Sequence, residues 1–178
     1  GLAAGALGVK AVKSAGDFQQ SIVKSASKVN MAQSTVEQFR DAAIDAGVES
    51  AFSAQKAADG LGFLAQAGFD AQQATEALPG VMQLASASGM ELAKSADIAS
   101  NVLSGMGLEV EELGRVNDVL VKTANSANTS VGQLGQAMSM AAPVASSMGV
   151  SLEQVSSAIG ILSNAGLQAT KAGTGVRQ

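Results

Sequence analysis

The stretch from Ser126 to Arg177 reads SANTSVGQLGQAMSMAAPVASSMGVSLEQVSSAIGILSNAGLQATKAGTGVR, and it contains the two local signals that decide the fold. The first signal is a polar residue followed three positions later by Gln, as in Ser130 with Gln133 and Ser151 with Gln154, which fits the capping box that opens a helix. The second is a glycine followed by a large apolar residue. Glycine adopts the left-handed conformation just past a helix end without a steric penalty. The stretch therefore predicts short helices separated by glycine turns.

The same punctuation recurs along the chain, with additional capping patterns at Ser34 with Glu37 and at Asp70 with Gln73. The expected joints are Gly47, Gly68, Gly89, Gly107, Gly149 and Gly166. Because the joints are about 20 residues apart, each interval holds one helix of roughly four turns. We predict helices over 4–30, 35–46, 54–67, 71–88, 91–105, 110–127, 131–147, 152–165 and 168–176. The fold class is all-α, a compact bundle of about eight or nine short helices joined by Gly-capped tight turns.

Two prolines fall inside the expected helices. The residue before a proline avoids the helical conformation, and proline lacks the backbone N–H that a helix interior needs. We therefore expect the helix over 71–88 to break or kink at Leu78 and to restart with Pro79 in its first turn. Pro143 is expected to bend the helix over 131–147.

Charge is almost absent from the opening stretch, since Glu153 is the only ionisable side chain between Lys122 and Lys171. The stretch is too rich in Ser, Asn, Gln and Gly for a membrane span or an apolar core helix. We expect such a surface to contact other protein. The candidate interface residues are Met138, Met140, Pro143 and Met148.

The composition argues against most enzyme classes, because the chain has no His and no Cys. Paired carboxylates such as Asp41 and Asp45 lack further ligands at loop spacing and are expected on exposed helix faces. We expect no catalytic residue, no metal and no cofactor. Residues 1–30 carry four Lys against one Asp, so the remainder of this chain of net charge −4 is acidic and does not favour DNA.

The organisation expected from these patterns is a basic N-terminal helix over residues 1–30 and a helical core domain over 31–178. The basic helix is either part of the bundle or the end of an upstream segment. The sequence has no initiator Met and no helix-ending signal at Arg177, so we expect it to be an excerpt of a longer chain.

Several landmarks resemble the conserved core domain of phage tail tape measure proteins of long-tailed phages and prophages. They are the run from Phe52 to Glu109, RVNDVL (Arg115–Leu120), ANTSVGQLGQAM (Ala127–Met138), APVA (Ala142–Ala145) and SNAGLQATKAGT (Ser163–Thr174). The resemblance covers roughly nine tenths of the chain from about Asp17 onward. Departures occur at Met140 and Ala141, where many members have an aromatic residue, and at Ala169 and Thr170, where many have a Gly-Ser step.

The resemblance implies a structural virion protein that takes part in tail assembly, tail length determination and genome ejection. It implies a place in the tail lumen of the virion, and in the host bacterial cytoplasm during assembly. Implied partners are tail tube and baseplate proteins, tail assembly chaperones and further copies of the chain, a trimer being one arrangement, with no direct reading of nucleic acid. One alternative is a membrane-active helical module that forms part of a DNA-delivery conduit in the host envelope. A cell-wall hydrolase is a third hypothesis, against which the lack of His and Cys counts.

Overall fold

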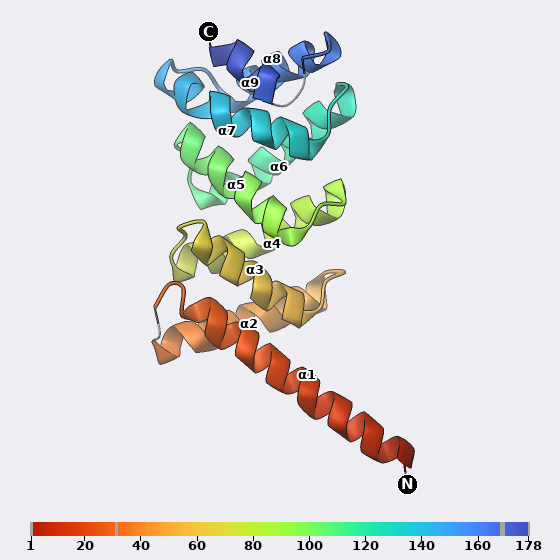
Figure 1. The fold of residues 1–178 in the computed structure, drawn as a ribbon. Helices are drawn as coiled ribbons and strands as arrows, with labels where there is room; N and C mark the ends of the chain where they lie inside the picture. Colours follow the sequence, from red (N-terminus) through yellow and green to blue (C-terminus); the bar gives the residue numbers. More distant parts are fainter. Residues whose placement is uncertain (1, 31, 168–169, 178) are drawn as a thin grey trace. The chain divides into compact units, whose positions relative to one another are not determined.

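The computed structural model describes residues 2–30, 32–167 and 170–177 (Figure 1). Its helices are α1 (Leu2–Ala26), α2 (Gln33–Glu49), α3 (Ala54–Gln66), α4 (Ala71–Ser88), α5 (Leu92–Met106), the 3-10 turn η1 (Val110–Glu112), α6 (Leu113–Ser126), α7 (Val131–Ser147), α8 (Leu152–Asn164) and α9 (Thr170–Arg177). No strand occurs in these ranges, so the all-α prediction is confirmed. The expected start of the last helix at residue 168 lies outside the described residues.

The chain divides into two compact units, one up to Leu78 and one from Pro79 onward. The boundary falls inside α4. Each unit is built from short helices whose apolar faces meet, as the 3.6-residue periodicity requires.

In the first unit, α1 and α3 run side by side in parallel. Ser25 Oγ donates to the Ala58 carbonyl at 2.8 Å, and one turn later Lys28 Nζ donates to the Gly62 carbonyl at 2.9 Å. The helices approach closely because Gly62 has no side chain: a Cβ there would lie 2.5 Å from Ser25 Oγ. Phe39 of α2 is fully buried and is one of the largest core residues of this unit.

In the second unit, α5 packs in parallel with α7, α6 packs with α8, and α9 packs on α7. Glycine again permits the close approach. A Cβ at Gly105 of α5 would lie 3.0 Å from the Ala142 Cβ, and one at Gly173 of α9 would lie 2.5 Å from the Ala137 carbonyl oxygen. This unit is therefore packed in two ways. Glycines let helix backbones approach closely, and large side chains such as Leu120, Leu134 and Ile159 are fully buried.

Five of the six expected joint glycines have positive φ and lie one or two residues after the last residue of a helix. They are Gly68, Gly89, Gly107, Gly149 and Gly166. At each one the N–H of the following residue donates to the carbonyl five positions earlier, for example Leu108 N to Leu103 O at 2.9 Å, which is the Schellman bond. Gly47 was expected to be a sixth joint, and this is wrong. It lies inside α2, where its missing side chain lets the backbone of Ala54 approach: a Cβ would lie 2.6 Å from the Ala54 nitrogen.

Neither proline is a helix joint. The structure shows α4 as one helix through Pro79 and α7 as one helix through Pro143, so a break at Leu78 with a restart at Pro79 is wrong. A kink at Leu78 and a bend at Pro143 stay predictions. Both rings lie on the solvent-exposed side of their helix. Each proline removes the helical hydrogen bond to the carbonyl four positions earlier, that of Thr75 or Ser139, and its ring crowds that carbonyl.

Three of the four capping boxes are present. Ser130 with Gln133 and Ser151 with Gln154 exchange both bonds, and Asp70 does so with Gln73, with the two distances 2.9 and 3.1 Å. The box expected at Ser34 is wrong because α2 begins one residue earlier, at Gln33.

Candidate interaction surface

The nearly uncharged stretch forms α7, α8 and the turns that follow them. Of its candidate interface residues, Pro143 and Met148 are exposed, Met148 to 73 %, and Met140 is half-buried. Met138 is fully buried, so its assignment to an interface is wrong. Met138 lies one helical turn after Leu134, on the core face of α7, and its sulfur accepts from Ser156 Oγ of α8 at 3.6 Å.

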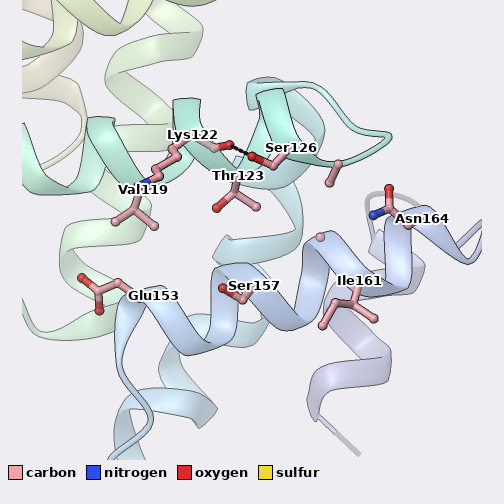
Figure 2. Close-up of a pocket in the computed structure, with 10 residues that line it drawn as sticks. Val119, Lys122, Thr123, Ser126, Glu153, Ser157, Ile161 and Asn164 are labelled. Carbon is pink, nitrogen blue, oxygen red and sulfur yellow. Dashed lines mark hydrogen bonds between the residues drawn. The ribbon is translucent and has the colours of Figure 1, made fainter.

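A groove of about 410 Å³ lies between α6 and α8 (Figure 2). Val119, Lys122 and Thr123 line it from α6, facing Ser157 and Ile161 of α8. Its lining also includes Gly160, where a Cβ would lie 3.1 Å from the Thr123 methyl group. The groove is mixed in polarity and open to solvent.

Polar contacts fix both ends of this groove. At one end the Arg115 guanidinium donates twice to the Glu153 carboxylate, at 2.8 and 3.1 Å, and once to Glu112 at 2.7 Å. At the other end the Asn164 side chain accepts from the Asn128 N–H at 2.7 Å. Polar contacts therefore join the start of α6 to the start of α8, and the turn after α6 to the end of α8.

The pKa of Glu153 is lowered from 4.5 to about 2, first by the hydrogen bond from Arg115 and then by the residue's own backbone N–H and by Ser151. The same bonds raise the pKa of Arg115 above its ordinary value. The single carboxylate of the uncharged stretch is thus ionised and paired at neutral pH. Its role is to join two helices.

Sequence reasoning missed several exposed apolar side chains. In the second unit Ile161 is 69 % exposed beside the groove and Leu167 is 43 % exposed. In the first unit Ile44 and Val48 of α2 are 42 % and 81 % exposed. The signal for the α2 pair was available, because the two residues are one turn apart on the side of the helix opposite Phe39 and Ala43.

The described residues contain no group of three or more acidic, His or Cys side chains placed to hold a metal ion. Within the same ranges, no helix is long and apolar enough to cross a membrane. The surface has exposed apolar side chains, a groove and neutral polar groups. Protein–protein interfaces use groups of these kinds.

Comparison with known proteins identifies the family of the chain. Residues 40–178 match the model of the phage-related minor tail protein family. The chain belongs to this family. It is also 36 % identical over 166 residues to the tape measure protein of Pneumococcus phage Dp-1, an alignment that covers 93 % of the chain and 14 % of that protein. No solved structure matches the chain. The resemblance to tape measure proteins that the sequence landmarks indicated is thereby confirmed.

Proposed function

We propose that this chain is a structural module of a tape measure protein that acts in phage tail assembly, in tail length determination and in genome ejection. The observation that carries the proposal is the alignment of 93 % of the chain with the tape measure protein of phage Dp-1. The chain spans about one seventh of that protein's length, so the proposed role is that of one module and not of a whole tape measure protein.

The geometry favours a docking module over the length-setting segment itself. A straight α-helix adds ~1.5 Å per residue, so an extended helix sets a length in proportion to its residue count. Here α5 lies beside α7 and α6 lies beside α8. Helices that lie side by side add less length per residue than one extended helix. The closely packed glycines, such as Gly105 against Ala142, hold the helices in this folded form.

We infer that the module comprises residues 31–178 and that the surface around Met140, Pro143 and Met148 contacts other tail components. Tail tube and baseplate proteins, assembly chaperones and further copies of the chain are the partners that fit a neutral, partly apolar surface in the tail lumen. The chain would meet the chaperones in the host cytoplasm during assembly. The 73 % exposure of Met148 supports this surface, since flexible, polarisable Met side chains adapt to different partners.

The test is an in-frame deletion of codons 40–178 in the phage that encodes this chain, followed by electron microscopy of the lysate. A docking module is required for assembly, so we expect filled heads without tails. Tails shortened by about 210 Å, the helical length of the deleted residues, would make this segment part of the ruler instead. Tails of normal length and number would refute a role in assembly.

A further inference from the structure

The outer side of α2 carries an acidic stripe with exposed apolar residues. Glu37, Asp41, Asp45 and the apolar pair Ile44 and Val48 follow one side of the helix at intervals of three or four residues. All five are exposed, Val48 to 81 %. Like charges one turn apart weaken a helix by ~0.2–0.5 kcal/mol per pair, so this arrangement has a cost that folding alone does not explain.

Arg40 is the cation of α2, and it does not neutralise the stripe. Its guanidinium donates to Gln19 Oε1 of α1 at 2.8 Å. In the described part of the chain, the ion pairs join Arg115 to Glu112 and to Glu153, and neither Asp41 nor Asp45 takes part in one. The stripe on α2 therefore remains both negatively charged and apolar.

The opposite chemistry occurs on the exposed side of α3 and the end of α1. Lys56 lies 5.9 Å from the centre of the Phe52 ring, and Lys28 lies 5.9 Å from the centre of the Phe63 ring. Lys24 is exposed one turn before Lys28. Phe52, two residues before α3, and Lys56, Asp59 and Phe63 within it recur at intervals of three or four residues, as in the α2 stripe. With Lys24 and Lys28 they form a basic-aromatic surface of net charge +2.

We propose that the α2 stripe of one copy of this chain docks on the basic-aromatic surface of a second copy. The carboxylates of Asp41 and Asp45 would meet the ammonium groups of Lys24 and Lys56, and Val48 would pack on a phenylalanine ring. Both charge and apolar character are complementary, and each copy carries both surfaces. The proposal rests on the self-association included in the proposed function and names its contact.

The contact joins different surfaces of the two copies, so it is heterologous and can repeat from copy to copy into a ring or a row. Each stripe is about three helical turns long, ~16 Å. Such a contact covers less than the ~800 Å² per partner that stable complexes bury, so we expect association in the micromolar range or weaker. Charge complementarity should also make the association sensitive to salt.

The experiment is sedimentation of the full 178-residue chain over a concentration series, for the unmodified chain and two double variants. Asp41→Lys with Asp45→Lys reverses the stripe, and Lys24→Glu with Lys56→Glu reverses the basic surface. Lys28 is left intact because its ammonium bonds to the Gly62 carbonyl. We expect each double variant alone to associate at least about tenfold more weakly. An equimolar mixture of the two variants should regain association, since each then finds a complementary surface.

Matched controls change the same number of charges on exposed side chains elsewhere, as Glu76→Lys with Asp118→Lys and as Lys94→Glu with Lys171→Glu. The controls should associate like the unmodified chain, and circular dichroism should show all variants equally helical. An unmodified chain that stays monomeric to millimolar concentration would overturn the proposal and leave the tail function untouched. Equal weakening by the controls would overturn it too. So would unchanged association together with a loss of binding to DNA or anionic vesicles.

Discussion

Gly47→Ala provides the sharpest test of how the two kinds of glycine in this chain differ. A Cβ at position 47 would lie 2.6 Å from the nitrogen, 2.8 Å from the Cα and 3.0 Å from the Cβ of Ala54. These atoms belong to the start of α3 and cannot rotate away as a flexible side chain would. Overpacking of this kind costs about 1–3 kcal/mol. Alanine favours a helix over glycine by about 0.5–1 kcal/mol, which offsets part of this cost. We expect the variant to be less stable, by up to about 2.5 kcal/mol.

The assay is thermal unfolding followed by circular dichroism at 222 nm, because the chain has no Trp or Tyr for fluorescence. For a chain of this size, about 1 kcal/mol corresponds to a shift in Tm of ~2–4 °C. Gly114→Ala is the matched control: Gly114 is in α6 with no atom within 4 Å of its Cβ position, so that variant should be more stable. Gly47→Asn should be worse than Gly47→Ala, because Asn is larger. An Asn variant more stable than the Ala variant would refute the close-approach argument and indicate a left-handed residue.

Three further predictions concern the second unit. Ser151→Ala removes the side-chain oxygen that accepts from the Gln154 N–H, and should lower the free energy of unfolding by about 1 kcal/mol in urea titrations. Met138→Ala empties a fully buried site and should cost about 2–5 kcal/mol, whereas Met148→Ala should leave Tm unchanged. Because the folded-state pKa of Glu153 is about 2 and its ordinary value is 4.5, its contribution to stability is complete above pH 4.5 and is lost as the pH falls toward 2. The Tm advantage of the unmodified chain over Glu153→Gln should be small, since the pair is exposed, and should shrink as the pH falls from 4.5 through 2. An advantage that is undiminished at pH 2 would contradict the assignment.

The helices themselves could be predicted because their signals are local. Apolar periodicity and glycine or cap punctuation are contained within about 20 residues, which is the length of one helix and its turn. What glycine does at a given site is not a local property. Gly47 followed by Val48 has the same pattern as Gly68 followed by Phe69, yet Gly68 has a φ of 100° and Gly47 is helical. The difference is the proximity of Ala54, which only the packed structure reveals.

The pairing of helices is less local, but the joint spacing contained part of it. Three pairs of helices two apart within one unit, α1 with α3, α5 with α7 and α6 with α8, run parallel, and their contacts join residues separated by about two joint intervals. Ser25 bonds to Ala58, Ser146 bonds to Met106, and Arg115 bonds to Glu153, across 33, 40 and 38 residues. A helix and its turn reverse the chain direction, so two of them restore it. The regular spacing therefore implied parallel pairs, although not which faces would meet.

Surfaces were the hardest part, because exposure depends on which neighbouring helix covers a side chain. The low charge of residues 123–170 pointed to contact with protein but could not separate Met138, inside the core, from Met148, outside it. For exposed surfaces, a second apolar stripe on a helix is a more informative signal than low charge, as α2 shows. Phe39 and Ala43 form one apolar pair of that helix, and Ile44 and Val48 form a second pair on the opposite side. One helix face packs on its own core, and the second apolar pair, set among carboxylates, is the part of α2 that the proposed contact would cover. Where two apolar stripes share a short helix, the one flanked by charge is the better candidate for an interface.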